Sequence, residues 1–212
     1  TRESMVDGDG VILATSVFGW TDAESDRWWR TPHLALESPL PTACRYESEP
    51  FWCNAAGFRI GLPNPQLVNI SLEHFERRGL TRAAIVVPVH LPFGQIGAAS
   101  YSPVDSSKLD LAKEFEAYSD ILGLLTRTFV AGYVRVMCRP KLVPVDTRLS
   151  KREIECVGWA AVGKTDQEIS MIIARSPATV RFHLENAAVK LESVNRSQTV
   201  FKAAQLGYIG YL

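Results

Sequence analysis

Residues 176–191 hold apolar side chains at helical spacing, and Val180, Leu184, Ala187 and Leu191 fall on one helix face. If that face is buried, a rotation of roughly 100° per residue turns a second set outward. This set is Phe182, Glu185, Asn186 and Val189, flanked by Thr179, Arg181 and Lys190. Arg or Asn can bond base edges or phosphates, Glu can accept from a cytosine amino group, and an apolar ring can pack near a thymine methyl. The face suits a DNA major groove, and equally a solvated face of an ordinary helical bundle.

Four capping signals divide the last third of the chain into short helices. They are Ser150 with Glu153, Thr165 with Glu168, Ser176 with Pro177, and Asn195 with Gln198. Gly163 and Gly207 stand where helices should stop. Two further inward faces are predicted, from Ile154, Val157 and Ala161 and from Ile169, Ile172 and Ile173. The sequence therefore predicts a four-helix domain over residues 149–212.

The order and spacing of these residues resemble the LuxR-type helix-turn-helix domain. The matching text is Leu149-Ser150-x-Arg152-Glu153, Trp159-Ala160-Ala161-x-Gly163-Lys164-Thr165, Glu168-Ile169, Ser176-Pro177-x-Thr179-Val180-x-x-His183, Lys190-Leu191 and Asn195-Arg196. The resemblance implies a DNA surface formed by Lys164, Thr165, Ser176, Thr179, Arg181, Phe182, His183, Glu185 and Lys190. It implies structural roles for Glu153, Trp159, Gly163, Val180 and Leu191, and a dimer contact from residues 195–207. The expected partners are double-stranded promoter DNA, a second copy of the chain, and RNA polymerase if the protein is an activator.

Length and composition limit the rest of the chain. With 212 residues and 46% hydrophobic content, we expect one or two packed domains. No run of about 18 apolar residues indicates a membrane span, and no signal-peptide core is found at the N-terminus. The resemblance therefore implies a location in the bacterial cytoplasm. Because residue 1 is Thr, we expect the native chain to begin earlier, with an N-terminal piece missing.

Charge is unevenly divided along a chain whose net charge is zero. From Arg148 onward there are nine Lys or Arg residues against six Asp or Glu, so this part carries +3 and residues 1–147 carry −3. This small surplus is weak support for a DNA-facing module beside a neutral-to-acidic partner domain.

The N-terminal region alternates between strand and helix signals. Strands are predicted at residues 10–18, 50–53, 58–60, 82–89 and 95–101, and helices from residue 21, over 64–78 and over 106–136. Residues 91–94 contain the turn of a hairpin. The predicted fold class is α+β, with an α-β-α sandwich around an antiparallel sheet in domain 1–138, a proline-containing linker at 139–148 and the four-helix domain at 149–212.

A second resemblance covers this sandwich. The chain reads Phe75-x-x-x-Gly79-Leu80-x-x-x-x-x-Val86-x-Pro88-Val89-His90-x-Pro92-x-Gly94-x-x-Gly97, which resembles the autoinducer-binding domain of quorum-sensing regulators. That family binds an N-acyl-homoserine lactone through a Trp, a Tyr and an Asp followed by Pro. Alignment on Pro39 puts Ser38 at the Asp position, Trp29 at the Tyr position, and Ser25 at the lactone-binding Trp position unless Trp28 takes its place.

The resulting candidate ligand-binding residues are Trp28, Trp29, Ser38, Pro39, Trp52 and Cys53. Plain core packing is an equal reading of the tryptophans. A buried ligand amide N–H that faces no acceptor loses about 1–3 kcal/mol of binding free energy. The Ser38 hydroxyl can still accept from it, but without the charge of a carboxylate. We therefore expect an atypical small-molecule signal or none, with an ordinary lactone receptor as the alternative.

Catalytic and metal sites find no support in the sequence. Nucleophile–base pairs, paired carboxylates and phosphate-cradling glycine loops do not occur at convincing spacing, so we expect no enzyme. The cysteines are Cys44, Cys53, Cys138 and Cys156, without a C-x-x-C pair, and the histidines are His33, His74, His90 and His183. Residues 7–10 read as an acidic surface turn, because no glutamate follows at calcium-loop spacing. The sequence predicts buried reduced thiols and no metal.

Overall fold

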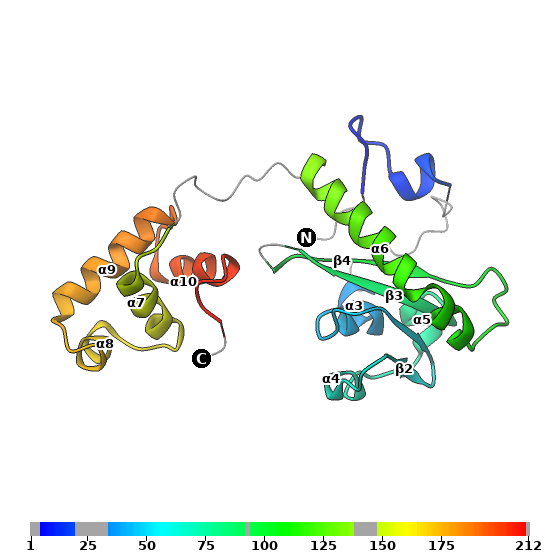
Figure 1. Cartoon of the computed structure of the whole chain (residues 1–212), viewed down its shortest axis with the longest axis horizontal. Helices are drawn as coiled ribbons and strands as arrows, with labels where there is room; N and C mark the ends of the chain where they lie inside the picture. Colours follow the sequence, from blue (N-terminus) through cyan, green and yellow to red (C-terminus); the bar gives the residue numbers. More distant parts are fainter. Residues whose placement is uncertain (1–4, 20–33, 92–93, 138–147, 211–212) are drawn as a thin grey trace. The chain divides into compact units, whose positions relative to one another are not determined.

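The computed structural model describes residues 5–19, 34–91, 94–137 and 148–210. The chain forms two compact units (Figure 1). The first consists of residues before 140, and the second consists almost entirely of residues from 140 onward. Trp28, Trp29, the helix predicted from residue 21, Cys138 and residues 139–147 of the predicted linker lie outside the described residues. In the described part of the chain, no helix is long and apolar enough to cross a membrane.

A four-stranded antiparallel sheet forms the centre of the first unit. Its strands are β1 (Phe51–Asn54), β2 (Gly57–Arg59), β3 (Ala83–His90) and β4 (Ile96–Tyr101), in the order β2-β1-β3-β4. All seven residues from Ala83 to Val89 are buried, as expected for a central strand covered on both faces. The four strands predicted after residue 49, and the hairpin between the last two, are confirmed.

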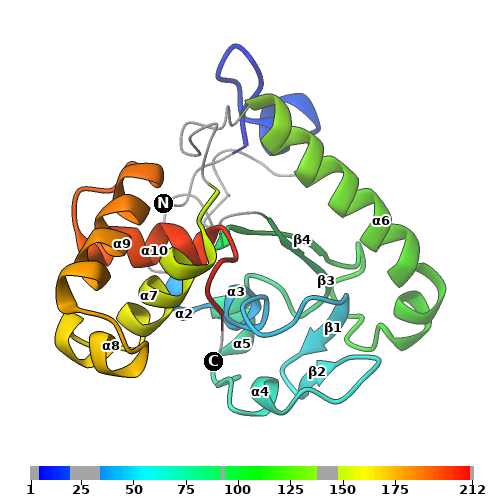
Figure 2. The same ribbon diagram turned by 60° about the vertical axis from the view of Figure 1, so that its left-hand side comes forward.

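Short helices cover one face of this sheet and a long helix covers the other. The short helices are α2 (Leu34–Glu37), α3 (Pro39–Ala43), α4 (Pro65–Val68) and α5 (Phe75–Gly79). One core joins Phe51, Cys53, Ala84 and Val86 of the sheet to Leu40, Ala43, Cys44, Leu67 and Phe75. On the opposite face Ala83, Ile85 and Leu111 pack with Trp52, Tyr101, Phe115 and Leu122, the last two on α6 (Ala112–Met137). Figure 2 shows α6 and the group α3–α5 on opposite sides of the sheet, which confirms the α-β-α sandwich.

The strand predicted at residues 10–18 is wrong. A single bridge joins Val6 to Ile12, and Leu13–Val17 form a short π-helix, η1. β-Branched residues favour a strand only where a neighbouring strand completes the ladder, and among the described residues this segment has just that one bridge. The acidic turn before it is confirmed, since the Asp7 carboxylate accepts from the amides of Asp9 and Val11 at 3.0 and 2.8 Å.

The helix predicted over residues 64–78 is interrupted. Asn64 caps α4 as expected, but the chain leaves the helix after Val68 and resumes in α5. His74 takes the left-handed conformation at φ 53°, and the Arg78 guanidinium holds the break by donating to the carbonyls of Ser71 and Glu73. The stop is also one residue later than predicted, because Leu80 and not Gly79 adopts the left-handed conformation.

The second unit contains the four predicted helices, α7 (Lys151–Ala161), α8 (Asp166–Ile172), α9 (Pro177–Lys190) and α10 (Arg196–Gln205). All four capping signals form as predicted, and Gly163 and Gly207 follow the ends of α7 and α10 at φ 87° and 75°. The predicted inward positions of Ala161 and Ile172 are wrong, because both are exposed. Ala161 is the last residue of α7. Of the three isoleucines in or next to α8, Ile169 and the C-cap Ile173 are buried, whereas Ile172 is 44% exposed.

An ion pair ties the beginning of α7 to the end of α9. The Lys190 ammonium donates to both carboxylate oxygens of Glu153, at 3.0 and 2.8 Å, and Glu153 also accepts from the Ser150 amide at 2.7 Å. The Glu153 side chain is 5% exposed. Burial alone would raise the pKa of this carboxyl, but the bonds from Lys190 and Ser150 outweigh it and hold the pKa below its ordinary value.

Glycine at position 97 permits close packing of β4 on α6. A Cβ atom added there would lie 2.9 Å from Cγ1 of the buried Val130. Gly97→Ala should therefore destabilise the first unit by about 1–3 kcal/mol. Urea unfolding of the full chain, with hydrogen exchange read on peptides from β3 and β4, measures this change. Ala98→Ser, at an exposed neighbouring position, is the control, and equal stability of the two variants would contradict the packing argument.

Replacing Glu153 by Gln keeps a side chain able to cap α7 but removes its charge. Because the folded pKa is depressed, the charge stabilises the fold above the ordinary value of 4.5 and stops doing so as pH falls through the folded value. We expect Glu153→Gln to cost about 1–3 kcal/mol at pH 7, and less at pH 4 and below. Urea unfolding at these pH values, with hydrogen exchange on α7 and α9 peptides, measures both costs.

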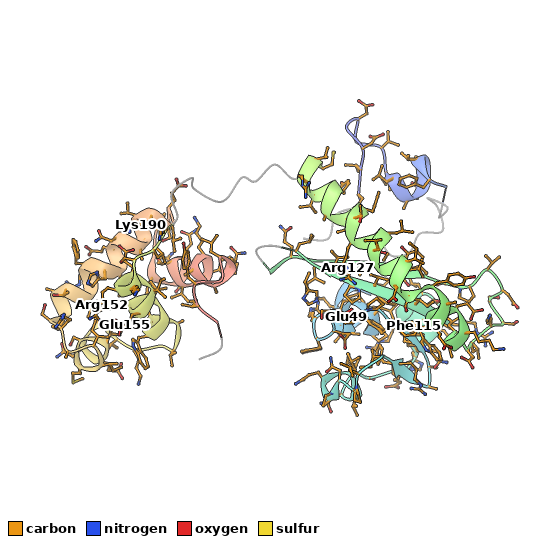
Figure 3. The ribbon with its side chains drawn as sticks, in the orientation of Figure 1. Glu49, Phe115, Arg127, Arg152, Glu155 and Lys190 are labelled. Atoms are coloured by element: carbon orange, nitrogen blue, oxygen red, sulfur yellow. The ribbon has the colours of Figure 1, made fainter. Side chains whose placement is uncertain are left out.

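The matched control for this variant is Glu155→Gln, which also removes one carboxylate from α7. Glu155 pairs with Arg152 three residues away, and its side chain is 38% exposed, so we expect a loss of about 0.5 kcal/mol or less. Figure 3 marks this pair on α7 and Lys190 on α9. A loss for Glu153→Gln no larger than the control, or one independent of pH, would contradict the assigned role.

Candidate nucleic-acid interface

Burial of one face of α9 orients the helix. Val180, Ala187 and Leu191 are fully buried, and Leu184 is half-buried among the two clusters that join α9 to its neighbours. The turn that precedes α9 contains Ala174 at φ 50°, and Ser176 caps the helix by accepting from the Thr179 amide at 3.1 Å. Helix α8, this turn and α9 thus form a helix-turn-helix arrangement.

The opposite face of α9 is exposed. The Arg181 side chain is 67% exposed, Phe182 is 58% exposed, and Glu185 and Val189 are also exposed. Asn186, predicted to point outward, is half-buried. An arginine, an acidic side chain and an aromatic ring are therefore presented together, and these three groups can contact guanine, cytosine and thymine edges respectively.

Other predicted contact residues lie around the ends of α8 and α9. Ser176 and Thr179 share a hydroxyl hydrogen bond of 2.9 Å at the start of α9. Thr165 caps α8, and the Lys164 ammonium lies 3.3 Å from the Glu168 carboxylate. Bonds from the Thr165 amide and hydroxyl, and then from Lys164, lower the pKa of Glu168. His183 is half-buried and packs edge-on against Phe182, with ring centroids 5.7 Å apart.

Lys190 is the predicted contact residue with the strongest internal partner. Its ammonium is held by Glu153, and its side chain is only 37% exposed. The positive charge of Lys190 is therefore balanced within the fold more closely than that of Arg181, whose nearest carboxylate oxygen lies 3.7 Å away.

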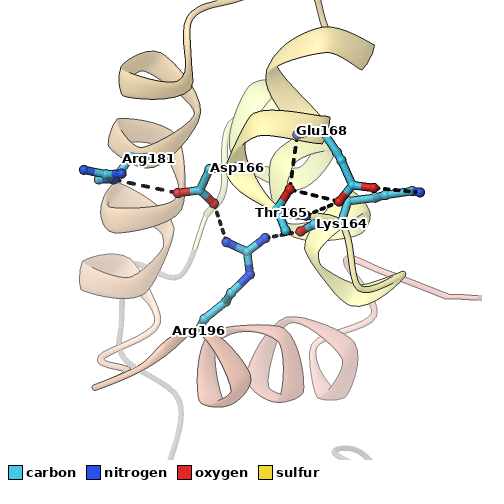
Figure 4. A network of polar contacts seen from close by, with 6 residues as sticks. All are labelled: Lys164, Thr165, Asp166, Glu168, Arg181 and Arg196. Atoms are coloured by element: carbon cyan, nitrogen blue, oxygen red, sulfur yellow. Dashed lines mark hydrogen bonds and ion pairs between the residues drawn. The ribbon is translucent and has the colours of Figure 1, made fainter.

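Asp166 and Arg196 form part of the site that sequence reasoning missed (Figure 4). Arg196 at the start of α10 donates to the Asp166 carboxylate at 2.5 Å and to the Lys164 carbonyl at 2.6 Å. The other Asp166 oxygen lies 3.7 Å from Nε of Arg181. Arg196 stands in the resembling sequence text, but spacing alone gives no sign of its partner 30 residues away.

The four predicted ligand residues that the structure describes do not share one face of the sheet. Ser38 and Pro39 are buried, and the Ser38 hydroxyl accepts from the Leu40 amide at 3.4 Å as the cap of α3. Cys53 is buried on the sheet face that α3 covers, whereas Trp52 is half-buried on the face that α6 covers. Successive strand residues point to opposite faces, so Trp52 and Cys53 cannot line one pocket together, and strand alternation in the sequence already carries that signal.

The buried thiols offer little reactivity. Burial raises the pKa of both Cys44 and Cys53 to about 12, so neither is a thiolate near neutral pH. Cys156 is also a buried free cysteine. Within the described ranges no group of three or more His, Cys, Asp or Glu side chains is arranged to hold a metal ion.

Comparison with known proteins places this arrangement in a family. Residues 147–203 match the bacterial regulatory proteins of the luxR family. The transcriptional activator AhyR of Aeromonas hydrophila is 32% identical over 192 residues, 87% of this chain and 70% of AhyR. The activator VanR of Vibrio anguillarum is 34% identical over 130 residues, 60% of this chain and 52% of VanR, so the match spans about half the length of that relative.

Among solved structures, a crystal structure of Escherichia coli SdiA aligns with 89% of this chain and 74% of SdiA, at 24% identity and a TM-score of 0.46. AhyR and VanR are both transcription regulators and not enzymes. The sequence identity shared with AhyR over both units, together with the helix-turn-helix match in the second, shows that this chain belongs to the LuxR family of bacterial transcription regulators.

Proposed function

We propose that this protein is a dimeric regulator that binds a palindromic promoter site in the bacterial cytoplasm through α9. The observation that carries the proposal is the exposed face of this helix, where Arg181, Phe182 and Glu185 lie opposite the fully buried Val180 and Ala187. A rigid helix with such a face enters the major groove as one unit. The +3 charge from Arg148 onward favours approach to phosphates without fixing the sequence that is read.

A second copy of the chain is the proposed partner of an apolar group on α6 and of one exposed aromatic ring on α10. On α10 Phe201 is 60% exposed, and on α6 Ile121, Leu124 and Leu125 are 48–62% exposed. Exposed apolar side chains grouped on one helix are typical of protein–protein contacts. A dimer presents two α9 helices to half-sites about one DNA turn apart, which explains a palindromic site. AhyR and VanR are named as activators, and by analogy we propose RNA polymerase as a further partner.

We propose that the first unit is a sensor that takes an atypical small-molecule signal or none. Ser38 stands where the resembling domains carry an Asp, and its hydroxyl oxygen already accepts from the Leu40 amide. A hydroxyl has no charge with which to strengthen a bond from a ligand amide. The alternative is an ordinary receptor for N-acyl-homoserine lactones, which the autoinducer-domain sequence from Phe75 to Gly97 supports.

Arg181→Ala tests the DNA-binding proposal. A duplex enriched by the wild-type protein from a random-sequence library serves as the specific site. The variant should lose about 1–3 kcal/mol of affinity for this duplex and have relaxed preference at one base position, because a bidentate guanine contact is removed. Fluorescence anisotropy with the enriched duplex and with single-base variants of it measures both effects.

Arg152→Ala is the matched control, because it removes an arginine from α7 whose charge is already paired with Glu155. It should leave affinity and base preference unchanged. An equal small loss on every duplex for Arg181→Ala would make this residue a phosphate contact, and no loss at all would contradict its place at the interface.

Ligand titration tests the sensor proposal. Simple N-acyl-homoserine lactones of several chain lengths should leave the thermal midpoint of the purified full chain nearly unchanged, since a weakly bound ligand stabilises little. Differential scanning calorimetry over a range of lactone concentrations measures this. A large rise that grows with concentration would favour the lactone receptor instead.

A further inference from the structure

Asp166 stands between two arginines from different helices (Figure 4). One carboxylate oxygen accepts from Arg196 on α10 at 2.5 Å, and the other lies 3.7 Å from Nε of Arg181 on α9. The Asp166 side chain is 25% exposed, against 67% for Arg181. A partly covered carboxylate on the first residue of α8 therefore faces the most exposed cation of the proposed DNA surface.

The two contacts of Asp166 differ in strength. Arg196 makes short charge-assisted bonds to Asp166 and to the Lys164 carbonyl, so the carboxylate is anchored. The distance of 3.7 Å to Arg181 exceeds a hydrogen bond, and an exposed pair of this kind contributes about 0–1 kcal/mol. DNA can therefore displace Arg181 from Asp166, while Asp166 itself stays in place.

We propose that Asp166 is a positioning residue that increases base discrimination by α9, because its fixed negative charge restrains Arg181 and opposes phosphate contacts that occur on any sequence. The inference rests on the proposed function of α9. Phosphate attraction is independent of sequence and dominates non-specific binding. A carboxylate beside the contact arginine weakens that attraction on every duplex, whereas a guanine in the right place restores affinity through two directed hydrogen bonds.

The cavity around these residues gives the guanidinium room to exchange partners. This open groove of about 280 Å³ is lined by Asp166, Arg181, Glu185, Asn195 and Arg196, together with apolar side chains such as Val157, Leu184 and Val200. Glu185 adds a second negative charge four residues after Arg181 on the same helix. Arg181 thus lies between the partly covered Asp166 carboxylate and the surface that DNA would occupy, where Glu185 is also exposed.

The test compares the full-length wild type with Asp166→Asn, a change that removes one charge and keeps a group able to accept from Arg196. Dissociation constants are measured on the duplex enriched by the wild type and on a scrambled duplex of the same composition, at several salt concentrations. We expect Asp166→Asn to bind the scrambled duplex about three- to tenfold more tightly. The preference for the enriched duplex should fall about threefold or more. The slope of the logarithm of affinity against the logarithm of salt concentration should steepen by up to about one.

Two further variants separate positioning from a general effect of charge or stability. Glu155→Gln removes the same charge from α7 and should leave the preference unchanged. In an Arg181→Ala background the effect of Asp166→Asn on preference should vanish, because Asp166 acts through Arg181.

An unchanged preference in Asp166→Asn, or the same change in the Arg181→Ala background, would overturn the inference. A merely structural role would lower both affinities by one factor and leave the preference and salt slope intact, which also overturns it. If the wild type enriches no sequence at all, the proposed function itself fails. If the wild type enriches a site and Asp166→Asn prefers that site equally well, only the inference about Asp166 fails.

Discussion

Burial of one face of α9 is the constraint on which the DNA-binding unit depends. Val180, Ala187 and Leu191 are fully buried, and a valine or leucine removed from water contributes about 1.5–3 kcal/mol. Since the helix is rigid, burying these residues also fixes where Arg181, Phe182 and Glu185 point. The Glu153–Lys190 pair then attaches the last turn of α9 to α7, which holds this end of the helix in addition to its buried face.

Local signals made much of this fold predictable from sequence. A capping serine, threonine or asparagine here accepts from the amide three residues later, so Ser150, Thr165, Ser176 and Asn195 mark helix starts without knowledge of the tertiary structure. Strand assignment failed at residues 10–18 because a strand needs a partner, which composition does not supply. The break between α4 and α5 depends on the Arg78 side chain bonding to carbonyls of the intervening loop, which periodicity does not reveal.

The candidate site was likewise only partly predictable from the sequence. Exposure of Arg181, Phe182 and Glu185 follows from helical rotation alone, so the sequence was sufficient. The partners of charged side chains were not predictable, because they come from distant parts of the chain. Lys190 is paired across 37 residues with Glu153, and Arg196 across 30 residues with Asp166. Both pairs change how available a cation on this unit is to DNA. Both could be identified only from the three-dimensional structure.

The most direct measurement of the central claim is hydroxyl-radical footprinting of the full chain, with and without the duplex that it enriches. Phe182 is 58% exposed on α9, and Tyr46 is 52% exposed on the first unit and serves as the internal reference. If α9 occupies the groove, oxidation of Phe182 should fall strongly on adding the duplex while that of Tyr46 stays constant. Equal oxidation of Phe182 in the free and bound protein would contradict the assignment of α9 as the helix that reads DNA.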